Sequence, residues 1–226
     1  FLRRLFAAGA FAQAAPASSL VRLDSPVGQS LLASSDNRDF WRLMSYFTYQ
    51  KKRYYCGVAS AVMVLNAGHV PAPATPELSP FRLFTQDNFF TPKVTQFIAP
   101  ELATSSGITF KELAAAIASF SSVSTERVYA NDLSLTAFRE QLKDLLNKDN
   151  YFVIAFYDRS KLGQKHGAHF PPIAAYDSAS DRFLTLETAR FDSPPFWVKI
   201  SDLYQAMHPE HSHTYGYLSV LLSRHD

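Results

Sequence analysis

The chain has 226 residues, of which 47% are hydrophobic and 14% aromatic, enough to build the packed core of a single domain. Its 22 basic and 20 acidic residues give a net charge of +2 without a long run of either sign. This balance argues against nucleic acid or an anionic membrane as the main partner. A single cysteine permits no internal disulfide and therefore carries no evidence about the redox compartment.

The first fifteen residues have the pattern of a bacterial export signal. Arg3 and Arg4 form a basic patch, followed by a short apolar stretch and then by small residues in A-x-A spacing. The apolar part is shorter than the roughly 20 residues that a spanning helix needs. We therefore expect residues 1–15 to be a signal or anchor and residues 16–226 to be one domain without a membrane span. The domain is expected in the periplasm, free or anchored, and the cytoplasm is the alternative if residues 1–15 are an amphipathic helix.

The next elements lead to the cysteine. Residues 20–23 can form a short strand, and Ser35 or Asp36 can cap a helix over residues 38–47, in which apolar residues recur at i, i+3, i+4 and i+7. A polar, basic segment then runs from Gln50 into a second apolar helix that begins near Gly57. We expect that helix to end at Gly68 in a left-handed cap.

Cys56 would lie at the N-terminus of this helix, where free N–H groups and the positive end of the dipole favour a thiolate. A thiolate can attack a carbonyl, and the oxyanion that forms needs hydrogen-bond donors beside it. The side-chain amide of Gln50, six residues upstream, could supply one donor and the backbone N–H of Cys56 another. The alternative interpretation is that Cys56 is a small buried core residue.

The rest of the chain combines helices with strands. Thr109 and Glu112 form a capping box for a helix through residue 119, and residues 133–146 make another amphipathic helix. Four later segments read as strands, and a turn at residues 177–181 joins two of them into a hairpin. These strands are residues 151–156, 170–176, 183–188 and 215–222. The sequence thus predicts an α+β fold in which a helical half packs against an antiparallel sheet half.

A nucleophilic cysteine needs an imidazole partner, and His169 opens one of the predicted strands among small neighbours. Glu187, 18 residues later on the next strand, is placed to orient that imidazole across the hairpin. Arg190 could hold a substrate carboxylate, although Glu187 and Arg190 could equally form a surface ion pair. The histidine-rich residues 208–213 lack the partner ligands of a metal site and are expected to form a solvated turn.

Together these segments resemble the phytochelatin synthases over about residues 38–222, and the block Ala-Arg-Phe followed by Pro-Pro-x-Trp is their most specific part. Bacteriocin-processing peptidases are similar to the Cys56 stretch alone. The matching residues are 43–47, Gln50, 55–60, 64–67, 107–110, Tyr157, Arg159, His169, Phe170, Pro172, Ile173, 189–191, Pro194, Pro195 and Trp197.

The resemblance implies a papain-like fold and an enzyme that cleaves glycine from glutathione through a cysteine acyl intermediate. Cys56 would be the nucleophile, His169 the base and Gln50 the oxyanion donor. The substrate-binding residues would be Arg190, Arg159, Tyr55 and Gly57. The family pattern has aspartate where this chain has Glu187, which is one methylene longer, and the chain stops where plant-type enzymes add a cysteine-rich region. It thus resembles the short bacterial form, for which hydrolysis is expected to dominate over polymer synthesis.

The expected partner is glutathione or a related γ-glutamyl thiol peptide, with a homodimer left open. No tightly bound cofactor is expected, and Cd or Zn would enter only as a metal thiolate with the substrate. Two alternatives remain at this point: a papain-like peptidase for leader peptides, and a non-catalytic binder of thiols or thiol–metal complexes.

Overall fold

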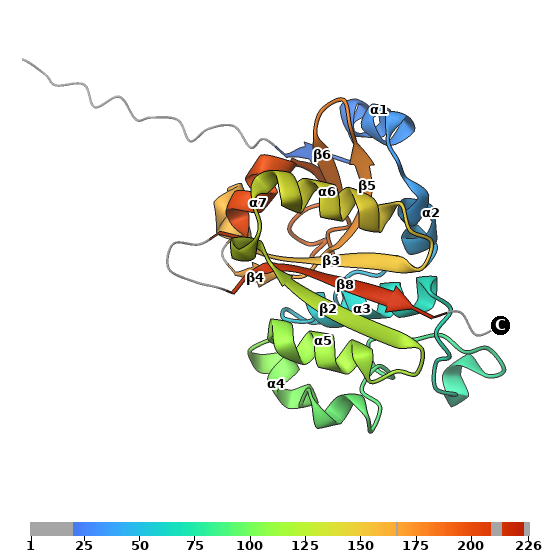
Figure 1. Ribbon diagram of the computed structural model, residues 1–226. Helices are drawn as coiled ribbons and strands as arrows, with labels where there is room; N and C mark the ends of the chain where they lie inside the picture. Colours follow the sequence, from blue (N-terminus) through green and yellow to red (C-terminus); the bar gives the residue numbers. More distant parts are fainter. Residues whose placement is uncertain (1–19, 166, 209–213, 224–226) are drawn as a thin grey trace, which may run out of the picture.

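The computed structural model describes residues 20–165, 167–208 and 214–223 (Figure 1). The helices are α1 Pro26–Ser34, α2 Arg38–Met44, α3 Cys56–Ala67, α4 Pro100–Ser105, α5 Phe110–Ala118, α6 Leu135–Leu146 and α7 Ile200–Ala206. The strands are β1 Val21–Arg22, β2 Val123–Tyr129, β3 Tyr151–Asp158, β4 Ala168–His169, β5 Pro172–Asp177, β6 Arg182–Thr185, β7 Phe196–Lys199 and β8 Gly216–Leu222. Short 3-10 helices cover Pro76–Leu78, Val94–Gln96, Ala130–Asp132 and Arg159–Leu162.

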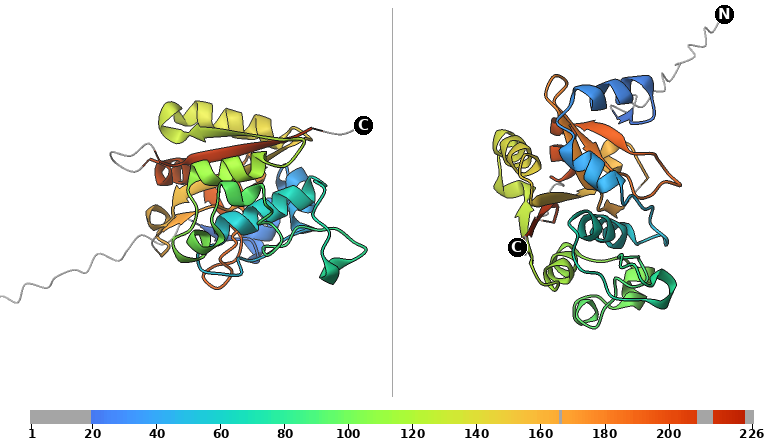
Figure 2. Two further views of the ribbon diagram at one scale, coloured as in Figure 1. Left: turned by 90° about the horizontal axis from the view of Figure 1, so that it is seen from below. Right: turned by 90° about the vertical axis from the view of Figure 1, so that its right-hand side faces the viewer.

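The described strands form one antiparallel sheet in the order β1-β7-β6-β5-β3-β8-β2, and β4 adds to β3 outside that row. Successive residues of a strand point to opposite faces, so a sheet covered on both sides should be apolar on both faces. In β3, Phe152 and Ile154 pack in the core that contains α3 and α5, while Val153 and Ala155 pack in the core that contains α6 and α7. Figure 2 shows α6 and the α3–α5 pair on opposite sides of β8.

These layers confirm the predicted α+β fold with a helical half against an antiparallel sheet half. Helix α3 is the centre of the helical half, because all twelve of its residues are buried. A helix that is apolar all round is one that other elements enclose. The helix that carries Cys56 is therefore held by the core on every side.

The ends of the helices predicted before Gln50 and after Cys56 differ in part from the structure. The helix expected to reach residue 47 ends at Met44, and Asn37 rather than Ser35 or Asp36 precedes it as N-cap. Gly68 was expected in a left-handed cap, but its φ is −89° and its neighbour His69 adopts the positive φ of 54°. Glycine at 68 serves packing instead, because a Cβ there would lie 2.0 Å from a methyl carbon of Leu222.

The predicted capping box is confirmed, since Thr109 and Glu112 exchange both hydrogen bonds.

Strands β2 and β7 were not anticipated. β2 includes Glu126 and Arg127 and is only partly buried, so it lacks the alternation by which strands are recognised. Its place at one edge of the sheet explains why it tolerates charges, because an edge strand has a neighbour on one side only. β7 has only four residues, too few to show a period.

The expected signal or anchor at residues 1–15 lies outside the described residues. Within residues 20–165, 167–208 and 214–223, no helix has both the length and the apolar character needed to cross a membrane.

Asp39 is a buried carboxyl that should make stability depend on pH. It is 1% exposed, and one of its oxygens has no hydrogen-bond partner among the described residues. Burial raises its pKa to about 7, against the nearby positive charges of Arg42 and Arg38. The folded chain therefore holds a proton between about pH 4 and pH 7 that the unfolded chain releases, so this group lowers stability as the pH rises through that window.

We expect Asp39→Asn to remove this loss, which amounts to at most about 4 kcal/mol for roughly three pH units at about 1.4 kcal/mol each. Urea unfolding of both proteins at pH 4.5, 6 and 8 would measure it, with the exposed Glu101→Gln as control. A difference between wild type and Asp39→Asn that stays constant across these pH values would contradict the assignment.

Candidate active site

Cys56 is the first residue of α3 and is 8% exposed. The first N–H groups of a helix have no partner within the helix. Here the backbone N–H of Phe170, from the sheet half, and that of Gly57 both lower the pKa of the Cys56 thiol. The sulfur therefore lies where two N–H groups and the positive end of the helix stabilise negative charge.

His169 reaches the sulfur from β4, which pairs with the end of β3 and places His169 opposite Tyr157. The two rings meet edge to face, with centroids 6.2 Å apart. Ser60, one turn after Cys56, donates a hydrogen bond to the carbonyl oxygen of Phe170. This bond ties α3 to the residue that follows His169. Sequence reasoning missed the positioning contacts of Ser60 and Tyr157.

Glu187 continues the chain of contacts. Its Oε1 lies 2.5 Å from His169 Nε2 and also accepts a hydrogen bond of 2.7 Å from the N–H of Ala189. Because Nε2 faces Glu187, Nδ1 is the ring nitrogen left for the hydrogen bond between His169 and the Cys56 thiol. Glu187 was expected within a strand, but β6 ends at Thr185, and the buried carboxyl is presented from the loop that follows.

The three groups fix one another's charge. Burial alone would raise the pKa of the Cys56 thiol, but the hydrogen bond and charge of His169 outweigh burial and hold that pKa below its ordinary value. Burial also disfavours a charged imidazole, yet Glu187 and Cys56 raise the pKa of His169 to about 9. The charges of His169 and Arg159 hold the pKa of Glu187 below its usual range despite burial. These shifts favour the thiolate form of Cys56, the imidazolium form of His169 and the carboxylate form of Glu187.

Gln50 contacts both the residue after Glu187 and the turn before Cys56. Its backbone N–H donates to the carbonyl of Thr188, and its Oε1 accepts from the Thr188 hydroxyl at 3.3 Å. Its amide Nε2 donates to the carbonyl oxygens of Lys52 (3.1 Å) and Arg53 (2.6 Å). In this conformation both amide hydrogens have acceptors in the turn before Cys56. The oxyanion role of Gln50 therefore stays a prediction that would require these bonds to change.

The two predicted arginines occupy different environments. Arg159 is 7% exposed and faces Asp192, with 3.3 Å between its Nη1 and Oδ2. Its Nε and the Oε2 of Glu187 are buried and lack hydrogen-bond partners among the described residues, a state that points to ordered water or ligand. Arg190 is exposed, and its guanidinium lies 5.7 Å from the centre of the Phe47 ring.

Arg190 also lines a pocket of about 680 Å³ next to Gln50. The pocket gathers basic side chains from two loops, which the sequence alone did not bring together. Asp192 is the single acidic residue in its lining. The basic residues are Lys51, Lys52, Arg53, Lys165 and Arg190.

Tyr55 and Gly57 are placed by packing. Tyr55 is 3% exposed, and its hydroxyl lies 3.1 Å from that of Thr104. A Cβ at Gly57 would lie 2.6 Å from a methyl carbon of Ile108, so glycine lets Ile108 approach the start of α3. Neither residue shows a free polar side chain aimed at the sulfur, and their substrate contacts remain predictions.

No group of three or more histidine, cysteine, aspartate or glutamate side chains in the described part of the chain is arranged to hold a metal ion. Five residues of the histidine-rich segment, 209–213, lie outside the described residues.

The ion pair predicts an alkylation profile that the single cysteine makes easy to follow. Iodoacetamide should modify Cys56 with a midpoint below the ordinary thiol pKa. In His169→Ala the midpoint should move above the ordinary value, because burial and the remaining charge of Glu187 then both oppose the thiolate. Mass spectrometry of the modified chain at a series of pH values would measure both midpoints. The urea-unfolded chain is the control, and equal midpoints in the two proteins would contradict the pair.

A cysteine at the N-terminus of a central helix, together with a histidine from an antiparallel sheet, is the arrangement of the papain-like fold. The family model for phytochelatin synthase matches residues 11–217. Three curated relatives have similar sequences. The chain is 30% identical over 204 residues to Glutathione gamma-glutamylcysteinyltransferase 1 of Lotus japonicus, which is 88% of this chain and 39% of that protein.

It is 32% identical over 169 residues to Glutathione gamma-glutamylcysteinyltransferase 2 of Arabidopsis thaliana (74% of this chain, 36% of that protein). It is 24% identical over 190 residues to Glutathione gamma-glutamylcysteinyltransferase of Schizosaccharomyces pombe (82% and 44%). The chain thus spans roughly two fifths of the length of these relatives. The family match over most of the chain, together with this fold, shows that the chain belongs to the phytochelatin synthase family.

Proposed function

We propose that this chain is a thiol enzyme that cleaves the Cys–Gly bond of glutathione through an acyl-enzyme on Cys56. The observation that carries the proposal is the buried chain from the Cys56 thiol through His169 to Oε1 of Glu187. The names of the relatives, glutathione gamma-glutamylcysteinyltransferases, supply the substrate and the acyl group.

The first half of the reaction uses the resting charges. The Cys56 thiolate adds to the carbonyl carbon of the cysteinyl–glycine amide, and the carbonyl oxygen becomes an oxyanion beside the N-terminus of α3. As this intermediate collapses, the C–N bond breaks and the imidazolium of His169 gives its proton to the leaving nitrogen. Glycine leaves, and γ-glutamylcysteine remains joined to the sulfur as a thioester.

The second half decides the product. With water as nucleophile, His169 accepts its proton, the thioester is hydrolysed, and γ-glutamylcysteine and the thiolate are released. With the amino group of a second glutathione as nucleophile, the same proton transfer forms a new amide bond and a longer peptide. We propose that hydrolysis dominates, as the resemblance to short bacterial members suggests.

The basic pocket supports a substrate with carboxylates. Glutathione carries two carboxylates and one ammonium group, and the five basic side chains beside Gln50 provide donors for the carboxylates. Lys165 and Arg190 are both exposed, but Lys165 is already paired with Asp192 at 2.8 Å. Arg190, whose guanidinium lies over the Phe47 ring, is therefore the better placed donor of the two. A metal thiolate of glutathione would carry the same groups and enters the proposal as a form of the substrate.

The test is a product analysis. Purified protein is incubated with glutathione, with and without cadmium, and glycine, γ-glutamylcysteine and longer peptides are measured by chromatography and mass spectrometry. We expect glycine and γ-glutamylcysteine in equal amounts. Absence of glycine release under both conditions would contradict the proposal and favour a non-catalytic thiol binder. Cleavage of a di-glycine leader peptide in place of glutathione would favour the leader-processing peptidase.

A further inference from the structure

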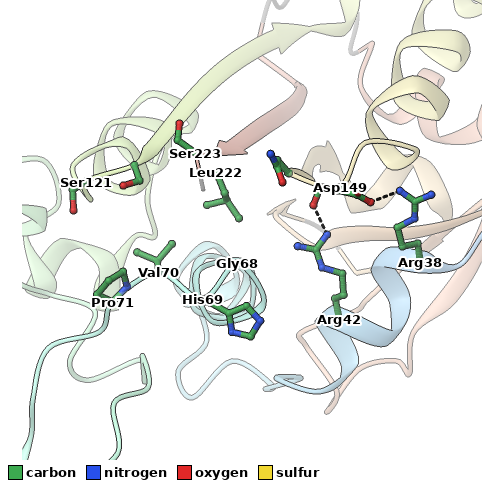
Figure 3. Close-up of a pocket in the computed structure, with 12 residues that line it drawn as sticks. Arg38, Arg42, Gly68, His69, Val70, Pro71, Ser121, Asp149, Leu222 and Ser223 are labelled. Atoms are coloured by element: carbon green, nitrogen blue, oxygen red, sulfur yellow. Dashed lines mark hydrogen bonds and ion pairs between the residues drawn. The ribbon is translucent and has the colours of Figure 1, made fainter. Parts of the chain in front are cut away.

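A second pocket, of about 750 Å³, lies at the far end of α3 from Cys56 (Figure 3). The helix has twelve residues, so this end lies about 18 Å along the axis from the nucleophile at roughly 1.5 Å per residue. Neither Cys56, His169 nor Glu187 lines it. Its walls come from α2, from the residues after α3, from the turn before β2 and from the segments next to β3 and β8. The pocket is therefore separate from the candidate active site.

Two arginines, one helical turn apart on α2, form one side of this pocket. Arg38 Nη1 donates to the carbonyl of Asn147 (3.1 Å) and to Oδ1 of Asp149 (2.5 Å), and Arg42 Nη1 donates to the carbonyl of Asp149 (2.6 Å). The guanidinium of Arg42 also lies 4.3 Å from the centre of the Phe152 ring. The wall thus holds both side chains in place before any ligand arrives.

Among the described residues, the remaining donors of these arginines have no acceptor. Neither Nε nor Nη2 of Arg38 or Arg42 makes a hydrogen bond with any residue that the structure describes. The Nε and Nη2 hydrogens lie on one edge of a guanidinium, an edge that matches the two oxygens of a carboxylate. Because the side chains are already ordered, a carboxylate would bind them with little further loss of side-chain entropy.

The charges around the arginines are mixed. Asp149 lies on the same wall and is 62% exposed at its side chain, and the buried carboxyl of Asp39 contacts Arg42 from behind. A bare polyanion would face these two carboxyls as well as the arginines. A ligand that carries both signs satisfies each group, its carboxylate on the arginine edges and its ammonium near Asp149.

The opposite side suits a short aliphatic stem. Val70, Pro71 and Leu222 supply apolar surface there, and Figure 3 shows Val70 and Pro71 on one side of the His69 ring and Arg42 on the other. The pocket volume lies within the range of small-molecule sites, roughly 300–1,000 Å³. We propose that this pocket binds a small zwitterionic peptide or amino acid through a free carboxylate on Arg38 and Arg42. The site stands on these contacts alone and does not rest on the proposed function.

The test uses the Cys56→Ser variant, in which no turnover consumes the probe. Glutathione, γ-glutamylcysteine, glycine and inorganic phosphate are titrated separately, and NMR follows the methyl groups of Val70 and Leu222 and the ring of His69. We expect saturable shifts at these positions with at least one of the three zwitterions and weaker binding of phosphate. No saturable shift with any zwitterion, or binding of phosphate as tight as that of each zwitterion, would overturn the proposal.

Variants separate this site from the active site. In the same Cys56→Ser background, Arg38→Gln should weaken binding at this pocket by about tenfold or more, as for loss of one charge-assisted contact. Ser121→Trp should block the pocket without removing either arginine. Arg22→Gln, which removes an exposed arginine elsewhere, is the matched control and should leave the affinity unchanged. Shifts of the His169 signals report binding at the active site independently. If the affinity measured from the Val70 and Leu222 signals is unchanged in both pocket variants, the proposal is overturned.

Discussion

Replacing Cys56 by serine should lower glycine release from glutathione by a factor on the order of 10⁴ or more, the scale of losing a catalytic nucleophile. The His169 imidazolium and two backbone N–H groups lower the pKa of the Cys56 thiol, but a serine hydroxyl is far too weak an acid to ionise in the same surroundings. Since the chain has no second cysteine, no other thiol can replace the lost one.

The measurement is the rate of glycine release, with thermal unfolding of both proteins as a check that the fold is unchanged. Wild-type protein alkylated at Cys56 should be equally inactive, although its substitution is chemically different. Binding of glutathione by Cys56→Ser should persist, because the basic side chains beside Gln50 remain. Full activity in the serine variant would show that the acyl-enzyme mechanism is wrong.

The meeting of Cys56, His169 and Glu187 was predictable because each stands in a strong local pattern. Cys56 falls where a polar segment meets an apolar helix, and His169 and Glu187 fall on two segments that a short turn joins. A hairpin brings such segments side by side whatever the details of its strand ends. The prediction of which residues meet therefore survived the error in where β6 ends.

Other parts of the site depend on contacts that no local pattern encodes. The bond from Ser60 to Phe170 joins residues 110 apart in the chain. Lys165, which comes from the other half of the fold, lines the same pocket as the segment around Gln50. The amide orientation of Gln50 depends on the turn at Lys52 and Arg53, whose backbone carbonyls accept its hydrogens. A charge-rich edge strand such as β2 is equally hard to predict, because its stability comes from its partner β8 rather than from its own alternation.

Replacing Glu187 by glutamine should reduce turnover by about 10²-fold or more, by analogy with losing the carboxylate of a Ser-His-Asp site. The glutamine keeps the size of the side chain and can still accept the N–H of Ala189, so the fold should be retained. It removes the charge that raises the pKa of His169. With a lower pKa, less of the imidazole is protonated, and less of Cys56 is therefore held as thiolate.

The loss should depend on pH in a way that simple misfolding would not. In the wild type, activity should fall as the pH rises through about 9, where His169 loses the proton needed by the leaving glycine. In Glu187→Gln this alkaline limb should move to lower pH, because the raised pKa of His169 depends on the lost carboxylate. The profile of kcat/KM against pH measures the shift.

Two variants complete the comparison. Glu187→Asp keeps the charge and should restore part of the lost turnover, with the shorter side chain limiting the recovery. Asp192→Asn should have a much smaller effect, because Asp192 faces Arg159 and Lys165 rather than His169. A Gln variant with the turnover and the alkaline limb of the wild type would show that Glu187 does not orient His169, and the longer carboxylate in place of the family's aspartate would then have no catalytic role.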